Sequence, residues 1–209
     1  MKNELRNLIS GTGEVRNGAL IKSAAGYLRG SSIAGHVAQS EKHYKREETK
    51  DLVKFIERDN LWVISVNFDN YISEGAEQRV YLEDGRHVLK LNDAIYYNSW
   101  LDYFHNLLLH NFFFPDTAYK LLGFTQKENT LYAVVEQPFV KATEPTDLQL
   151  VKLFLTSNGF QNTRNHDYFN PDLGIILEDL HDENVLTENG TLRFIDTVFY
   201  VRHNILFEE

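Results

Sequence analysis

The sequence predicts a compact α+β fold in which an antiparallel sheet precedes a smaller region of short hairpins. Two observations predict the sheet: residues 71–91 hold three strand-like segments separated by polar turns, and residues 119–136 hold two more. A third predicts the smaller region, because residues 175–197 alternate short apolar segments with tight polar loops. We expect a helical extension before both regions.

Composition limits the classes of function. The 209 residues carry a formal net charge of −9 and include no cysteine. The negative charge argues against a nucleic-acid backbone or an anionic membrane as the main partner, and without cysteine the chain has neither disulfides nor thiolate chemistry. No apolar run approaches the roughly 18 residues of a membrane span, and no signal pattern begins the chain. We expect a cytoplasmic protein that binds neither nucleic acid nor membrane.

Residues 1–60 are predicted to form the helical extension. Two helix-capable segments, Ala19–Leu28 and Ile33–Gln39, are separated by glycine-containing turns. The charged segment His43–Asp59 carries an apolar stripe at helical spacing, which indicates an amphipathic helix packed on the main body. The extension shows no chemistry of its own.

Residues 61–140 are predicted to form the sheet and one long helix. Residues 62–68 alternate as a half-buried strand, and two strands within 71–82 lead through an Asp-Gly turn into a third at 87–91. Lys90 lies between two leucines on that third strand, so its side chain points to the opposite face. It faces either a cleft or solvent.

The long helix is predicted to begin at Asn92 or Asp93 and to end near His110, before Pro115. A hairpin of residues 119–125 and 131–136 follows. Its second strand continues into Glu136-Gln137-Pro138-Phe139-Val140, where the proline removes one backbone N–H.

Residues 141–209 carry the most informative pattern. After a helix capped near Asp147 and ended at Asn158-Gly159, a hairpin of residues 167–175 leads into the loop of residues 178–184. Asp179 and Asn184 belong to this loop, and Asp196 ends the next hairpin arm. Three oxygen-bearing side chains therefore converge where strands end, as a Mg²⁺–phosphate site requires.

The pattern Asp-x-x-x-x-Asn, followed by an apolar-Asp pair, resembles the catalytic core of the protein-kinase-like superfamily. The spelling Asp179-Leu180-His181-x-x-Asn184 is similar to that of aminoglycoside and choline phosphotransferases. The chain also resembles small kinase-like domains in polyvalent proteins of bacterial mobile elements. This implies ATP and Mg²⁺ as cofactors: Asp179 would take the acceptor proton, Lys90 would neutralise the ATP phosphates, and Asn184 and Asp196 would hold the metal.

The resemblance also assigns nucleotide contacts and a lobe order. Residues 61–140 would be the N-lobe and residues 141–209 a reduced C-lobe. Within the N-lobe, Ser73, Gly75 and Gln78 stand at the three glycine places of the kinase phosphate loop. The full set of expected cofactor-binding residues is Gly75, Val80, Lys90, Asp102, Glu136, Gln137 and Phe139. Asp102 is expected to pair with Lys90 in place of the usual helix Glu.

Several positions depart from the kinase pattern. Two loop glycines are replaced, Leu177 stands where a His is usual, and few residues follow Asp196, so the C-lobe is expected to be truncated. The alternative function is therefore an inactive pseudokinase that binds nucleotide or acts as a scaffold. Retention of Lys90 and of the three oxygen-bearing residues favours a phosphotransferase. Its acceptor would be a protein or a small molecule, and a partner protein would complete the C-lobe.

Overall fold

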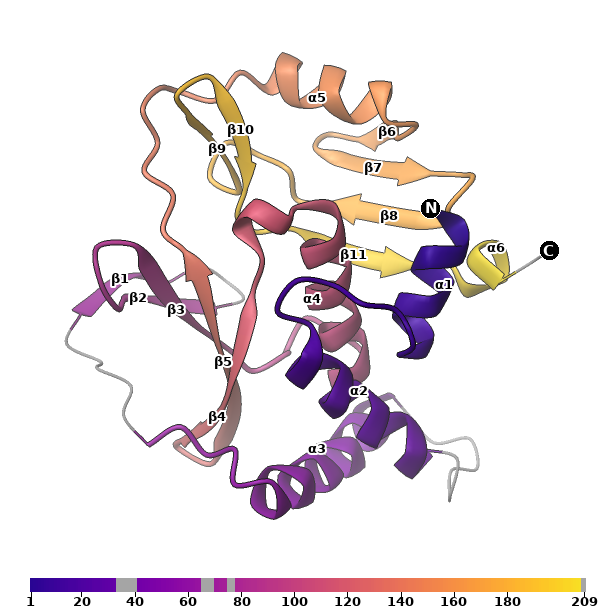
Figure 1. Cartoon of the computed structure of the whole chain (residues 1–209), viewed down its shortest axis with the longest axis vertical. Coiled ribbons are helices and arrows are strands. Elements are labelled where there is room, and N and C mark those ends of the chain that lie inside the picture. The colour runs from indigo at the N-terminus through magenta and orange to yellow at the C-terminus, as the bar shows by residue number, and fades with distance from the viewer. Residues whose placement is uncertain (33–40, 65–69, 75–77, 208–209) are drawn as a thin grey trace.

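A five-stranded sheet, a central helix and a smaller group of strands make up the computed structural model (Figure 1), which describes residues 1–32, 41–64, 70–74 and 78–207. The five-stranded sheet, which with the central helix forms the N-lobe, has the order β1-β2-β3-β5-β4, and every neighbouring pair is antiparallel. Its strands are β1 Tyr71–Glu74, β2 Gln78–Leu82, β3 His87–Asn92, β4 Lys120–Lys127 and β5 Thr130–Pro138. The predicted α+β class and the antiparallel N-lobe sheet are confirmed.

Strand β3 lies in the middle of the sheet and carries Lys90. This residue is opposite Val80 of β2 on one side and Val135 of β5 on the other. Leu89 and Leu91 are buried on the far face, so the alternation of side chains directs Lys90 toward the near face, as predicted.

Helix α4, Trp100–Phe113, runs through the centre of the molecule (Figure 1). The predicted start at Asn92 or Asp93 is wrong. The side chains of these residues accept backbone N–H bonds from Ala94 at 2.6 Å and from Ile95 at 3.0 Å, which makes turns in place of a helix cap. Ser99 caps the helix instead, since its hydroxyl accepts the N–H of Asp102 at 2.9 Å.

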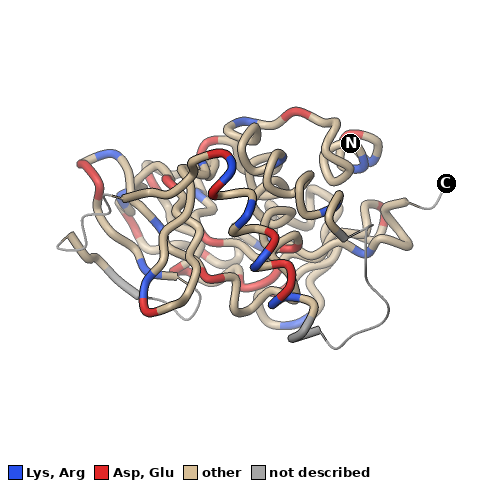
Figure 2. The backbone as a smooth tube through the Cα atoms, turned by 90° about the horizontal axis from the view of Figure 1, so that it is seen from below, with Lys and Arg blue, Asp and Glu red and all other residues tan. Residues whose placement is uncertain are grey.

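The N-terminal region forms α1 Lys2–Ser10, α2 Ala19–Ser32 and α3 Glu41–Arg58. Figure 2 shows Lys and Arg interspersed with Asp and Glu along the backbone. The sequence of α3 has the same mixture of charges. Two predicted elements lie wholly or partly outside the described residues. The segment Ile33–Gln39 is not described, and of the strand predicted at 62–68 only residues 62–64 are. Within these, Trp62 forms one β-bridge with Phe124. No helix among the described residues is long and apolar enough to cross a membrane.

Helix α1, which the sequence did not predict, belongs to the core of the C-terminal region. Leu5 and Ile9 of α1 are buried in the same cluster as Val151 and Leu155. Arg6 also donates from Nε to the carbonyl oxygen of Leu206 at 2.6 Å. The two ends of the chain therefore pack together (Figure 1).

The C-lobe, residues 141–207 of the described chain, contains α5, two small sheets and a terminal helix. Its elements are α5 Leu148–Ser157, β6 Gln161–Arg164, β7 Asp167–Asn170, β8 Ile175–Glu178, β9 Val185–Glu188, β10 Thr191–Phe194, β11 Val198–Val201 and α6 His203–Phe207. The first sheet has the order β11-β8-β7-β6, and the second consists of β9 and β10. The residues after Asp196 thus return to the sheet beside the strand that precedes Asp179.

Glu48 of α3 is a buried carboxyl group that binds the first turn of α4. It is 5% exposed and accepts the N–H groups of Trp100 at 2.5 Å and Leu101 at 3.2 Å. A carboxylate at a helix N-terminus is stabilised by these donors and by the helix dipole. Burial nevertheless raises the pKa of Glu48 from 4.5 to about 7.

We predict that this carboxyl group makes folding less favourable as pH rises. Below pH 4.5 Glu48 is protonated in both states; between pH 4.5 and about 7 the unfolded chain loses the proton first, so the free energy of unfolding falls. Glu48→Gln should remove about 1–3 kcal/mol of the difference between pH 4.5 and 7. Urea unfolding across this range measures it. Glu57→Gln, on the exposed side of α3, should follow the parent, and equal slopes for all three proteins would contradict the prediction.

Candidate active site

A cavity of about 430 Å³ opens between the N-lobe sheet and the C-lobe loops. Its lining residues are Ile72, Gln78, Val80, Val88, Lys90, Gln137, Pro138, Phe139, Val140, Glu183, Asn184, Leu186, Ile195 and Asp196. Strands β2, β3 and β5 supply one wall, and the loop before β9 and the end of β10 supply the other. Polar groups therefore meet apolar side chains from both lobes in this cavity.

Lys90 is the cation of the cavity and is 4% exposed. Its Nζ donates to the carbonyl oxygen of Ile195 at 2.9 Å and lies 3.7 Å from Oδ2 of Asp196. It also lies 5.4 Å from the ring centre of Tyr119, a cation–π distance. Burial lowers the pKa of Lys90, and the charge of Asp196 opposes this shift.

Asp179 and Asn184 are tied together within one loop. Asp179 has the left-handed φ of +66°, and the Nδ2 of Asn184 donates to its carbonyl oxygen at 2.8 Å and to its Oδ2 at 2.9 Å. Nε2 of His181 lies 3.3 Å from the other carboxylate oxygen. The Asp179 side chain is 58% exposed and lies outside the lining of the cavity, whereas Asn184 lines it.

Asn184 and Asp196 are brought together by the backbone. The carbonyl oxygen of Asn184 accepts the N–H of Ile195 at 2.9 Å and the N–H of Asp196 at 3.3 Å. Both residues line the cavity. Their oxygen donors suit Mg²⁺, which is bound by one or two protein groups together with substrate phosphates. Among the described residues no cluster of three or more His, Asp or Glu side chains forms a metal cage.

Gln78 is a contact that sequence reasoning did not assign. It stands at the third glycine place of the kinase phosphate loop, and its Nε2 donates to Oδ2 of Asp196. The side chain is 8% exposed, so it occupies space inside the cavity. The replacement of a glycine by glutamine was the signal in the sequence, but its partner lies on the other lobe.

At the strand end of residues 136–140, two of the three residues expected to contact the nucleotide line the cavity. Gln137 and Phe139 line the cavity, whereas Glu136 faces the opposite side, where it pairs with Lys120 at 3.1 Å. The side chain of Glu136 is therefore not a cavity contact. The N–H of Phe139 donates to the carbonyl oxygen of Arg86 at 2.7 Å, so it is already used within the N-lobe.

The expected pairing of Asp102 with Lys90 is not what the structure shows. Asp102 lies near Glu48, whose pKa its charge raises, and lines a separate small cavity with His105 and Phe199. Lys90 takes its counter-charge from Asp196 instead. Gly75, expected to contact phosphate, lies outside the described residues, and Val80, expected to contact the nucleotide, lines the cavity.

His110 of α4 supports the site from behind. It is fully buried; its Nδ1 lies 2.7 Å from Oγ1 of Thr197, and its Nε2 lies 3.1 Å from the carbonyl oxygen of Thr117. Burial, together with the charge of Lys90, lowers the pKa of His110 to about 3, and the hydrogen bond with the Thr117 carbonyl oxygen opposes this shift. The ring is therefore neutral and links α4 to the residue that follows Asp196. A histidine within an apolar helix was the available signal.

Comparison with known families gives one match. The family described as serine/threonine/tyrosine kinases found in polyvalent proteins matches residues 45–203, more than half of the chain. The match includes strand β3, the loop of Asp179 and Asn184, and Asp196. No curated protein and no solved structure matches the chain.

We predict that His110 makes the fold acid-sensitive. Its pKa is about 6.5 in the unfolded chain and about 3 in the folded protein, so stability is fully present above pH 6.5 and falls as the unfolded state takes up a proton. His110→Gln cannot titrate, and should lose about 2 kcal/mol less than the parent between pH 6.5 and 4.5. Chemical unfolding at several pH values measures the slopes. A parental slope in His110→Gln would refute the role.

Proposed function

The chain belongs to the family of serine/threonine/tyrosine kinases found in polyvalent proteins, and on this premise we propose that it transfers the γ-phosphoryl group of ATP to an acceptor hydroxyl with the help of Mg²⁺. The observation that carries the proposal is the meeting of Lys90, Asn184 and Asp196 in one cavity between the lobes. A buried ammonium beside two oxygen donors is the arrangement that a metal–polyphosphate group needs.

The cavity also offers a slot for a flat base. Val80 and Val88 line it from the N-lobe sheet, and Leu186 lines it from β9 of the C-lobe. These apolar side chains would hold the adenine ring from both faces. Because Pro138 has no N–H and that of Phe139 is bonded to Arg86, the backbone of Val140 is our candidate for reading the base.

The catalytic residues would share the work as follows. Lys90 would neutralise the α- and β-phosphates, and Asn184 and Asp196 would hold Mg²⁺, which when bound offsets the charge of the transferred group. Asp179 would orient the acceptor hydroxyl and take its proton while the acceptor oxygen bonds to the γ-phosphorus and the bond to the ADP oxygen breaks. The exposed Asp179 lies outside the cavity wall, where an acceptor has access.

The contact between Gln78 and Asp196 favours a second candidate, an inactive pseudokinase. Gln78 fills part of the cavity and binds Oδ2 of Asp196, a carboxylate oxygen on the expected metal ligand. A kinase would have to break this hydrogen bond or leave Oδ1 for the metal. A scaffold would keep it as a permanent link between the lobes.

The first prediction tests nucleotide binding, which a kinase requires and a pure scaffold does not. ATP with Mg²⁺ at a hundredfold over its Kd should stabilise the protein by about 2.7 kcal/mol, or about 5–10 °C in Tm at this size. Asp196→Asn should lose the Mg²⁺-dependent part of the shift and keep any metal-free part, because it removes one charge without changing shape. Thermal melts with ATP alone and with ATP and Mg²⁺ measure both. No shift at millimolar ATP and Mg²⁺ excludes the kinase function.

The second prediction isolates chemistry from binding. Asp179→Asn should bind ATP and Mg²⁺ about as well as the parent, since the side chain acts on the acceptor and Asn tolerates a left-handed φ. Its phosphoryl transfer should fall by roughly 10²–10⁴-fold, the usual size of a general-base or positioning effect. Radiolabelled phosphate transfer or intact mass of autophosphorylated protein provides the assay. Equal turnover in both proteins would show that Asp179 has another role.

A further inference from the structure

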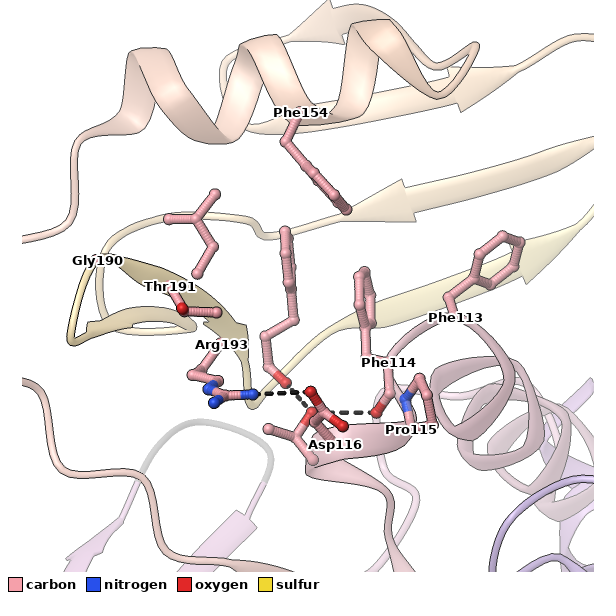
Figure 3. A pocket seen from close by; sticks show the side chains of 11 residues that line it. Phe113, Phe114, Pro115, Asp116, Phe154, Gly190, Thr191 and Arg193 are labelled. Atoms are coloured by element: carbon pink, nitrogen blue, oxygen red, sulfur yellow. Dashed lines mark hydrogen bonds and ion pairs between the residues drawn. The ribbon is translucent and has the colours of Figure 1, made fainter.

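A second cavity, of about 350 Å³, lies between α5, the β9–β10 hairpin and the end of α4. In Figure 3, Phe154 reaches from α5 toward Phe114 and Phe113, and Gly190 and Thr191 of the hairpin stand on the other side. Its complete lining is Phe113, Phe114, Pro115, Asp116, Thr117, Phe154, Gly190, Thr191, Leu192, Arg193 and Phe194. Four of these eleven residues are phenylalanines, and neither Asp179 nor Lys90 belongs to the lining.

The outer edge of β10 faces this cavity with open backbone groups. The Asn189-Gly190 turn has positive φ at both residues, which makes a two-residue hairpin whose flanking pair is hydrogen-bonded. The next residue, Leu192, therefore directs its N–H and C=O away from β9. Its opposite residue Thr187 does the same, because the Thr187 carbonyl oxygen accepts an N–H from Thr143 on the other edge at 2.9 Å.

The two edges of this small sheet differ. The edge of β9 is covered by the segment of Thr143 and Glu144, whereas within the described chain no strand pairs with the outer edge of β10. On that edge the Phe194 carbonyl oxygen accepts from the hydroxyl of Thr117, which leaves Leu192 as the open position. An uncovered strand edge can accept one further extended strand.

The apolar surface also continues beyond the cavity. On α5 the side chains of Leu150, Leu153 and Phe154 are 53%, 60% and 43% exposed and share one helical face. We call this cavity, together with the edge of β10 beside it, the aromatic groove. Its cation, Arg193, already has partners, since it pairs with Asp116 at 2.8 Å and with Glu188 at 3.4 Å. The groove therefore offers apolar contacts and main-chain hydrogen bonds and has no unpaired cation for a small anion.

We propose that this groove docks an extended polypeptide segment, which adds a strand to the edge of β10 and places one large apolar side chain among Phe114, Phe154 and Phe194. A strand edge beside an apolar pocket is the surface that strand-adding peptides use: main-chain bonds give affinity and the pocket selects a side chain. The inference deepens the proposed function, on which it rests for one point, namely that the acceptor of the kinase is a protein.

The groove is connected with the active site. A third cavity shares Asp116, Thr117 and Arg193 with the aromatic groove. The same cavity shares Pro138, Phe139 and Val140 with the cavity of the candidate active site, which we call the nucleotide cavity. A docked segment would lie beside the strand end that closes the nucleotide cavity and would leave the loop of Asp179 uncovered. An acceptor held there keeps access to that loop.

The test is a titration without nucleotide, so that its result does not depend on phosphotransfer. The probe is a hexapeptide with both termini blocked. Thr and Val alternate along it, except that one central position is Phe and one other position is Lys. Calorimetry or NMR shifts should show binding that weakens about tenfold or more when the peptide Phe becomes Ala, or in Phe154→Asp, because an aromatic anchor is lost. N-methylation on either side of the peptide Phe should weaken binding similarly by blocking strand pairing. Ile95→Asp, at an exposed apolar site elsewhere, should bind as the parent does.

Four outcomes would overturn the proposal. They are no binding by any peptide, binding unchanged in Phe154→Asp, equal binding of N-methylated and free peptides, and self-association of the parent that Phe154→Asp abolishes. The third assigns the cavity to small aromatic ligands, and the fourth assigns the face to a second copy of the chain, which sedimentation over a wide concentration range detects. A Phe154→Asp protein that keeps the parental Tm shows that loss of binding is not loss of fold.

Discussion

The arrangement of the two lobes depends on one buried ammonium group. Lys90 is almost completely removed from water, and an unpaired buried charge would cost several kcal/mol. Its hydrogen bond and its counter-charge both come from the strand end after β10, through the Ile195 carbonyl oxygen and the Asp196 carboxylate. Tyr119 donates to the same carbonyl oxygen at 2.8 Å. The N-lobe sheet is therefore linked through Lys90 and Tyr119 to the strand end that carries the residue proposed to bind metal.

This solution explains why α4 can dispense with an acid facing the cavity. Its inward side chain near Lys90 is the neutral His110, which holds Thr197 and Thr117 in place but contributes no charge. Asp196 consequently serves as the only close carboxylate for Lys90 among the described residues. An incoming polyphosphate would bring negative charge to the same place and could take over Lys90, which would release Asp196 to a metal. We therefore expect a bound polyphosphate to replace Asp196 as the partner of Lys90, and not simply to enter an unchanged pocket.

The sequence was sufficient where the determining contacts are local. Strand alternation gave the correct side for Lys90, and the cap at Asp147 and the break at Pro115 fell where short-range chemistry places them. It failed where distant contacts decide. Helix α1 is held by residues at the other end of the chain, and the partner of Gln78 lies 118 residues away. Asp102 shares a helical face with His105, as its spacing indicates, but tertiary packing turns that face toward Glu48 and Phe199 and not toward Lys90.

The same distant packing explains the uneven surface of the C-lobe. Helix α1 supplies Leu5 and Ile9, and α6 supplies Leu206, to the core beneath α5, so the buried face of α5 is satisfied from within the chain. Nothing among the described residues covers its opposite face, where Leu150 and Leu153 remain exposed. A helix that is apolar on two sides can bury more apolar surface than its own domain covers. Leaving this apolar face in water costs free energy. We therefore expect the face to take part in binding another polypeptide.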